Sequence, residues 1–219
     1  MRRLKFTTGE YYHIFNRGVD KRTIFSEKKD LERFFHSMQA FNTIEPIGSI
    51  YENSFKDKSK QLGRETSKLN DRLVSFVAYC LNPNHYHFIL EPLIENGVEK
   101  FMHRLGLGYT MYFNEKYKRS GSLFQGRYKA AHINSNEYLL YLSVYVNLNT
   151  EAHQLGDSVS KLVSKSSWSE YVDKRDNNNF CKKDIILDQF NKVIEYKKFA
   201  FEALDIIKEN KEISKLLLE

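Results

Sequence analysis

The sequence predicts an α+β fold in which helices pack on a mainly antiparallel sheet, followed by a largely helical C-terminal extension. Three observations support this prediction. Strand-like and helix-like segments alternate over roughly the first 150 residues, two strand-like segments flank a three-residue turn sequence, and a helical apolar pattern returns near the C-terminus. With 219 residues, of which 41% are hydrophobic, the chain can bury a core of its own.

The first third of the chain predicts a strand, a helix and a polar insertion. Residues 10–18, EYYHIFNRG, are aromatic and β-branched and end at a glycine, which predicts a strand and then a turn. Residues 26–42 carry apolar side chains at steps of three and four, which predicts an amphipathic helix with Ser26 as its N-cap. Residues 53–71 are polar, with five basic and three acidic side chains, and predict a surface insertion.

The next segments predict a hairpin and a long helix. RLVSFVAYCL and HYHFILEPL are rich in strand-forming residues and flank NPN, a turn sequence. Apolar residues at helical spacing run from Val98 to about Tyr117. Gly106 and Gly108 interrupt that helix at a cost of about 1 kcal/mol each, which predicts close packing or the approach of a ligand there.

A turn, a strand and a further helix complete the predicted core. Residues 121–133 predict the turn and the strand. The helix that follows has Asn134 as a candidate N-cap with Glu137 three residues later, the spacing of a capping box.

Charge and cysteine content restrict the partners and the environment. A formal charge of +6 favours a polyanionic partner such as nucleic acid. Cys80 and Cys181 are the two cysteines and form no CxxC pair, so a disulfide framework or a zinc knuckle is not expected. No stretch approaches the roughly 18 apolar residues of a membrane span, and the N-terminus lacks the apolar run of a signal peptide. A cytoplasmic location without a membrane partner is expected.

His85 and His87 in LNPNHYHFIL are candidate metal ligands. Side chains alternate across a strand, so the two imidazoles point to one face while Tyr86 points to the other. Two adjacent imidazoles chelate a divalent ion if a further ligand joins them. For an HxH pair by itself, however, a polar hairpin tip is the commoner explanation.

Tyr145 and Asn149 are the candidates for a nucleophile and a third ligand. They are four residues apart, one helical turn from each other. Tyr138, Tyr141 and Tyr145 also form an aromatic stripe of a kind that more often belongs to a core. Spacing alone does not choose among these tyrosines.

A basic and aromatic segment is the candidate nucleic-acid surface. Residues 104–129 contain six Lys or Arg, one Glu and six aromatic residues, a mixture that follows phosphates and stacks on unpaired bases. An ordinary amphipathic helix followed by a basic turn has a similar composition. The candidate DNA-binding residues, with those that follow the first strand, are Arg17, Lys21, Arg22, Arg104, Lys118, Arg119, Arg127 and Lys129.

Taken together, four segments resemble the single-tyrosine HUH transposases, the IS200-like and REP-associated tyrosine transposases. They are YYHIFNRG, NPNHYHFIL, MHRLGLGYTMYFNEKYKRSGSLFQGRYKA and EYLLYLSVYVNLN, and they span roughly residues 8–152. The resemblance implies a ferredoxin-like sheet. It makes His85 and His87 the metal-binding histidines, Asn149 the third ligand of Mg²⁺ or Mn²⁺, and Tyr145 the nucleophile.

The resemblance also implies a reaction. It is cleavage and transfer of single-stranded, hairpin-containing DNA through a 5'-phosphotyrosine intermediate, with a homodimer as one possible state. The alternatives are a DNA-binding regulator that does not cleave and an RNA-binding module on a similar sheet. Two departures from the family pattern stand out: Thr150 follows Asn149 where proline is usual, and Val144 precedes Tyr145 where arginine is frequent.

By this resemblance, residues 1–155 form the transposase-like catalytic domain and residues 156–219 the C-terminal extension. The extension has three possible roles: packing on the core, contacting DNA or mediating dimerisation. Core packing is the default expectation, because its apolar residues recur at helical spacing.

Overall fold

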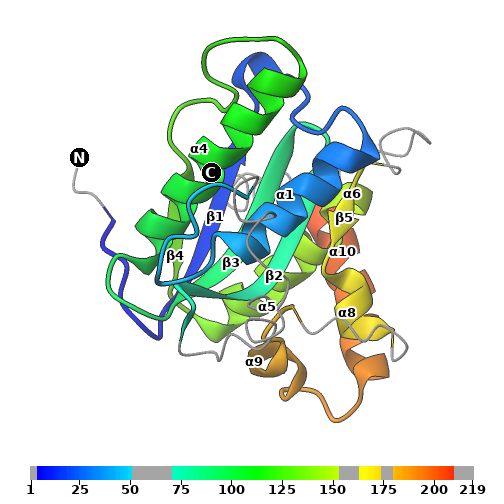
Figure 1. Cartoon of the computed structure of the whole chain (residues 1–219). Coiled ribbons are helices and arrows are strands. Elements are labelled where there is room, and N and C mark those ends of the chain that lie inside the picture. Colours follow the sequence, from blue (N-terminus) through cyan, green and yellow to red (C-terminus); the bar gives the residue numbers. More distant parts are fainter. Residues whose placement is uncertain (1–3, 51–70, 153–162, 174–179, 210–219) are drawn as a thin grey trace.

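The computed structural model of the chain has a five-stranded antiparallel sheet in its described parts, residues 4–50, 71–152, 163–173 and 180–209 (Figure 1). The strand order is β4-β1-β3-β2-β5. This confirms the predicted α+β fold with a mainly antiparallel sheet. The strands are β1 (Tyr11–Arg17), β2 (Val74–Asn82), β3 (His85–Pro92), β4 (Lys129–Ile133) and β5 (Lys165–Ser166).

Helices cover both faces of the sheet (Figure 1). One buried cluster lies between the sheet and helices α1 and α4, and a second lies between the opposite face and helices α5 and α10. The helical elements are η1 (Val19–Lys21), α1 (Lys28–Ala40), α4 (Gly97–Lys116), α5 (Asn136–Asn147), α6 (Asn149–Ala152), α8 (Trp168–Val172), α9 (Asp184–Leu187) and α10 (Val193–Glu209). None of the helices in the described ranges has the length and apolar character needed to cross a bilayer.

The first four strands and their helices follow the ferredoxin-like arrangement. The order β1-α1-β2-β3-α4-β4 places β3 between β1 and β2, with β4 on the outer side of β1. The helical crossovers α1 and α4 lie on the same face of the sheet. Right-handed crossovers explain this, since each returns the chain over the same side. The opposite face is therefore left for α5.

Two of the predicted helix starts were wrong by one residue. The N-cap of α1 is Glu27 rather than Ser26, and Glu27 forms a capping box with Asp30. Asp30 Oδ2 accepts hydrogen bonds from the backbone N–H groups of Ser26 and Glu27, at 2.9 and 3.2 Å. The N-cap of α5 is Ser135 rather than Asn134, because the Ser135 hydroxyl accepts the first-turn backbone N–H. In both cases several polar residues in a row offered a plausible cap.

The two glycines of α4 have different surroundings. A Cβ at Gly108 would lie 2.7 Å from the ring of Phe41, so this glycine allows α4 to approach the end of α1. Among the described residues, a Cβ at Gly106 would meet nothing within 4 Å. Of the two predicted alternatives, close packing or the approach of a ligand, close packing is thus found at Gly108 and not at Gly106.

The C-terminal segment completes the core. Strand β5 pairs with β2, with Ser166 opposite Cys80, and α10 packs on α5. Within the described residues the segment therefore follows the default expectation of core packing. Apart from Asp71, the polar insertion predicted at 53–71 lies outside the described residues.

A buried carboxylate joins the two helices of the first face. The Asp30 side chain is fully buried and contacts the ammonium of Lys116 at the end of α4. It also accepts hydrogen bonds from the hydroxyls of Tyr117, at 2.7 Å, and Tyr112, at 3.2 Å. Burial raises the pKa of Asp30, but the hydrogen bonds from Lys116 and Tyr117 outweigh it and hold that pKa below its ordinary value.

We predict that Asp30→Asn destabilises the protein by about 1–3 kcal/mol at pH 7, because it leaves the buried partners of the carboxylate poorly satisfied. A carboxyl whose folded-state pKa is lowered contributes stability above its unfolded pKa of about 3.9, and that stability is lost as the pH falls through the folded value. Urea unfolding between pH 7 and pH 2 measures both effects. The variant should lose less stability than the wild type below about pH 4.

Glu32→Gln is the matched control. Glu32 lies on the same helix in an exposed pair with Lys28, with N and O 3.7 Å apart, and its loss should change the free energy of unfolding by about 0.5 kcal/mol or less. An Asp30→Asn protein with wild-type stability and wild-type acid sensitivity would contradict the prediction.

Candidate functional site

The site lies on the α5 face of the sheet, where strand pairing lines up polar side chains. Phe15 of β1 is paired with His87 of β3, and His87 is paired in turn with Cys80 of β2. Two residues closer to the hairpin turn, His85 is paired with Arg17 of β1 on one side and with Asn82 of β2 on the other. Paired residues of an antiparallel sheet point to the same face, so these two rows face α5 together.

The surroundings of His85 define which of its nitrogens carries a proton. Nδ1 lies 2.6 Å from Asn84 Oδ1, and an amide oxygen only accepts hydrogen bonds. In the neutral imidazole the proton is therefore on Nδ1 and the lone pair is on Nε2. Nε2 lies 3.1 Å from Asn149 Oδ1 and 3.1 Å from Asn82 Nδ2.

Asn149 reaches His85 because the helix breaks between Asn147 and Asn149. Helix α5 ends at Asn147, with Leu148 as its C-cap, and Asn149 begins the short helix α6. The Asn149 side chain is fully buried, and its Oδ1 accepts a 2.6 Å hydrogen bond from Asn82 Nδ2. The Asn82 oxygen accepts in turn from the hydroxyl of Thr150, at 2.9 Å.

His87 is supported by a second buried histidine. His87 Nδ1 and His13 Nε2 lie 2.9 Å apart, so one of them donates to the other. Burial lowers the pKa of His13 to about 3, so this histidine is neutral near pH 7. Phe15 stacks on both imidazoles, with centroids 4.8 Å from His13 and 5.6 Å from His87. When the shared proton is on His87 Nδ1, its Nε2 offers a lone pair to a ligand.

Tyr145 is the tyrosine of α5 that lies beside the histidines. Its ring centroid is 5.5 Å from that of His87, with the planes at 85°, whereas Tyr141 packs against Phe199. The Tyr145 side chain is 1% exposed, and burial raises the pKa of its phenol above the ordinary value of 10. The Asn149 amide lies close enough to the phenol to lower that pKa in part, although its buried Nδ2 makes no full hydrogen bond within the described part of the chain.

The donor atoms fit a divalent cation. Two ligands at about 2.1 Å from an ion and at right angles are about 3 Å apart, close to the 3.1 Å between His85 Nε2 and Asn149 Oδ1. Imidazole nitrogen with amide oxygen suits ions such as Mn²⁺. Residues 4–50, 71–152, 163–173 and 180–209 contain no group of three or more His, Cys, Asp or Glu side chains placed for a metal. Asparagine is outside that set of residue types, so the two histidines and Asn149 are a candidate set of metal ligands within the described residues.

Four residues at this site were not singled out in the sequence, or not for the role they have. His13, Asn82 and Asn84 were not named as site residues, and Thr150 was noted only as a departure from the family pattern. Strand periodicity puts His13 on the same face as Phe15, which is a usable signal. The contacts of Asn82 and Thr150 depend on a pairing across 68 residues of sequence, and no local pattern reports it.

Part of the predicted basic surface lies at this end of the sheet. Arg17 is paired with His85, and Lys129 is paired with Phe15, over whose ring its ammonium lies at 5.8 Å. The loop before β4 runs beside the end of β1, since Gln125 N–H donates to the Arg17 carbonyl at 2.8 Å. Arg127 belongs to that loop. Lys21 and Arg22 follow directly after β1, in and next to η1.

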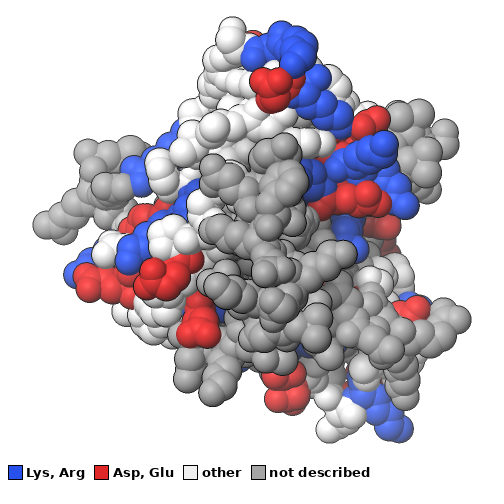
Figure 2. Space-filling model, viewed as in Figure 1, with Lys and Arg blue, Asp and Glu red and all other residues white. Residues whose placement is uncertain are grey.

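The remaining basic candidates already have partners within the protein. Lys118 pairs with Glu115 at 2.7 Å, and the Arg119 guanidinium donates to Asn114 at 2.7 Å. Arg104 donates to the backbone carbonyls of residues 43 and 44 and thereby holds the segment after α1. In Figure 2, basic side chains gather beyond the end of α4 and again along α1, where acidic side chains lie between them.

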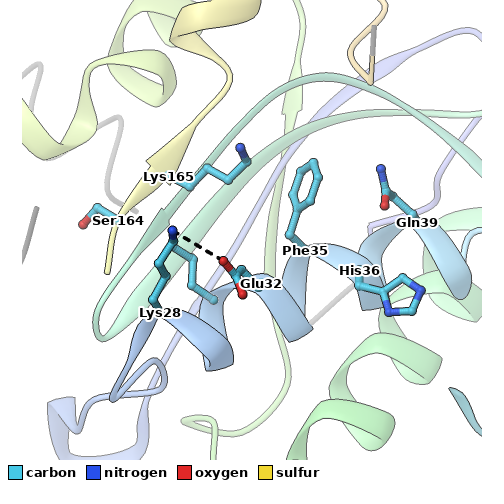
Figure 3. A pocket seen from close by; sticks show the side chains of 8 residues that line it. Lys28, Glu32, Phe35, His36, Gln39, Ser164 and Lys165 are labelled. Atoms are coloured by element: carbon cyan, nitrogen blue, oxygen red, sulfur yellow. Dashed lines mark ion pairs between the residues drawn. The ribbon is translucent and has the colours of Figure 1, made fainter. Parts of the chain in front are cut away.

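A pocket of about 340 Å³ lies between α1 and β5 (Figure 3). Its two lysines have close neighbours, since the Lys165 ammonium lies 4.9 Å from the centre of the Phe35 ring and Lys28 lies 3.7 Å from Glu32. None of the predicted catalytic or metal-binding residues lines this pocket.

Comparison with known proteins adds to this geometry. Residues 48–149 match a family model described as "Transposase IS200 like", and this range includes the two histidines, Tyr145 and Asn149. A solved structure of a REP-associated tyrosine transposase bound to a REP hairpin superposes with a TM-score of 0.52. That likeness covers 80% of this chain and 85% of the other at 13% identity, so it shows a shared fold. No curated protein matches the chain.

Proposed function

We propose that this chain, whose residues 48–149 match the IS200-like transposase family model, cleaves and rejoins single-stranded DNA through a covalent bond to Tyr145. The observation that carries the proposal is the position of the Tyr145 ring beside His87, at the face where His85 Nε2 and Asn149 Oδ1 converge. A nucleophile next to a site for a cation is the arrangement that phosphoryl transfer requires.

The proposed ligands of Mg²⁺ or Mn²⁺ are His85, His87 and Asn149. When bound, such an ion supplies positive charge that polarises the non-bridging oxygens of the scissile phosphate. The chain holds these ligands on rigid elements: the histidines are in β3 and Asn149 is fixed by Asn82. His13 fixes the orientation of the His87 ring through the bond at Nδ1.

The proposed step exchanges one phosphodiester bond for another. The phenolic oxygen of Tyr145 attacks phosphorus, the bond from phosphorus to the 3' oxygen breaks, and the phenolic proton is finally carried by the free 3'-hydroxyl. The 5'-phosphotyrosine keeps the energy of the phosphate bond, so a 3'-hydroxyl reverses the step without ATP. Burial raises the pKa of Tyr145, so the negative charge that develops on its oxygen has to be stabilised. The neighbouring Asn149 amide, which lowers that pKa in part, contributes to this stabilisation.

DNA is the proposed partner. The chain carries a charge of +6, and Arg17 and Lys129 lie on the two rows that hold the histidines. The fold is shared with a transposase whose structure contains a REP hairpin, and this supports a hairpin with unpaired flanking bases as the substrate.

The burial of Tyr145 favours a second candidate function. At 1% exposure the phenol reaches a phosphate only after the groups that cover it have moved. A DNA-binding regulator that does not cleave would need no such movement. Covalent capture distinguishes the two functions.

We predict that Tyr145→Phe abolishes covalent capture and leaves DNA binding within about twofold, because it removes the nucleophilic oxygen and keeps the ring. The protein is incubated with Mn²⁺ and a labelled pool of hairpins that carry randomised single-stranded flanks, and adducts are resolved on a denaturing gel. Tyr141→Phe is the matched control on the same helix and should form adducts like the wild type. Tight binding without any adduct in the wild type would favour the regulator.

We predict that Arg17→Ala and Lys129→Ala each reduce the salt dependence of DNA binding. Each lost phosphate contact on a single strand should lower the slope of log K against log salt by about 0.7. Arg104→Ala is the control, because its guanidinium is bonded to backbone carbonyls and its loss should change stability rather than the slope. Slopes equal to that of the wild type in both variants would exclude Arg17 and Lys129 as phosphate contacts.

A further inference from the structure

We propose that Asn82 and Thr150 are positioning residues, which hold Asn149 Oδ1 and His85 Nε2 at the spacing that a divalent ion needs. The inference rests on the proposed function, since it concerns the same site. It also gives a role to Thr150, the residue that departs from the family pattern at this position.

Two hydrogen-bond acceptors, His85 Nε2 and Asn149 Oδ1, face each other at the site. In its neutral form, with the proton on Nδ1 facing Asn84 Oδ1, His85 presents a lone pair at Nε2, and Asn149 Oδ1 presents another at 3.1 Å. Neither atom can donate to the other, so the contact is repulsive unless a donor or a cation is shared between them. Asn82 Nδ2 is such a donor, at 2.6 Å from Asn149 Oδ1 and 3.1 Å from His85 Nε2.

The Asn82 amide is held in one orientation. A rotation by 180° would place its oxygen against the same two acceptors. The Thr150 hydroxyl prevents this, because it donates to Asn82 Oδ1 at 2.9 Å and so distinguishes the oxygen end from the nitrogen end. Proline has no hydroxyl and could not make this bond. Asn82 itself is fully buried and is the last residue of β2, paired with His85 across the hairpin, so its backbone is fixed as well.

The two facing acceptors differ in the number of their lone pairs. His85 Nε2 has a single lone pair, which would bind the ion, so its contact with Asn82 would be lost. Asn149 Oδ1 has two lone pairs, and it keeps the hydrogen bond from Asn82 while it binds the ion. Asn82 thereby remains behind the ligand oxygen and keeps it aimed at the metal, as hydrogen-bonded partners of metal ligands generally do.

The test is the affinity of the full-length protein for Mn²⁺ without DNA, measured by electron paramagnetic resonance of the free ion. We expect Asn82→Ala to weaken binding about 10- to 100-fold, the usual effect of losing a partner behind a ligand. Thr150→Val removes the hydroxyl and keeps the shape of the side chain, and it should weaken binding in the same direction by less. Thr150→Ser keeps the hydroxyl and should bind Mn²⁺ like the wild type. Near-UV circular dichroism checks the fold of each variant, and Thr150→Val with Thr150→Ser carries the test if Asn82→Ala does not fold.

Two results would overturn the inference: unchanged affinity in Asn82→Ala and Thr150→Val, or tighter binding in Asn82→Ala. Tighter binding would mean that Asn82 only competes with the ion for its ligands. His85→Ala separates this failure from that of the proposed function. If His85→Ala loses Mn²⁺ binding while the Asn82 and Thr150 variants keep it, the metal site stands and only the positioning role fails. If His85→Ala binds Mn²⁺ normally, the metal site itself fails.

Discussion

The register of β3 against its two neighbours is the constraint on which the site depends. It places His85 between Arg17 and Asn82, and His87 between Phe15 and Cys80. A slip of one residue would turn every side chain of β3 to the opposite face, so the histidines would point at α1 and α4, and Tyr86 at α5. The register is firmly specified because both faces are buried: Tyr86 and Phe88 pack in the first cluster and Ile89 packs in the second.

The two faces divide stability and chemistry between them. The α1 and α4 face is closed by aromatic packing and by the contacts of the buried Asp30 carboxylate. The α5 face instead carries a chain of polar groups, from the partly buried Thr150 through the buried Asn82 and Asn149 to the partly buried His85. Buried polar groups are tolerated where their hydrogen bonds are made, and here nearly all are made internally. Asn149 Nδ2 is the exception: among the described residues it finds no hydrogen-bond partner, and it lies beside the proposed nucleophile.

Periodicity was sufficient to predict the strands and helices. It did not predict the helix caps, which depend on neighbouring residues, or the contacts between residues far apart in sequence. The hairpin and the helices α1, α4 and α5 follow apolar patterns of many residues, so a single residue that departs from the pattern does not change the prediction. The caps were wrong by one residue because neighbouring polar side chains compete for the same backbone N–H groups, as Ser26 and Glu27 do. Alternation along the strand is sufficient by itself to put His85 and His87 on one face.

The remainder of the site could not be predicted in this way. Nothing in the spacing distinguishes Tyr145 from its neighbours. The resemblance selected it, and the structure places it next to His87. His13 reaches His87 across 74 residues of sequence, and Asn82 reaches Asn149 across 67. Such contacts follow from the strand order, which a single sequence does not display.

The C-terminal segment holds α5, the helix of the proposed nucleophile, from the side opposite the sheet. Helix α10 packs on α5, and the hydroxyl of its Tyr196 accepts a 3.2 Å hydrogen bond from Asn147, two residues beyond Tyr145. Ser167, which follows β5, donates to the same Asn147 side chain at 2.5 Å, and its backbone N–H donates to the Tyr79 carbonyl. Helix α5 is therefore fixed on one side by the sheet and on the other by residues after position 163. Both of these hydrogen bonds to the Asn147 side chain are made at the last residue of α5. They therefore fix the point at which the chain turns to bring Asn149 to His85. The segment after the transposase-like core thus helps to build the site, although it supplies none of the groups proposed to react.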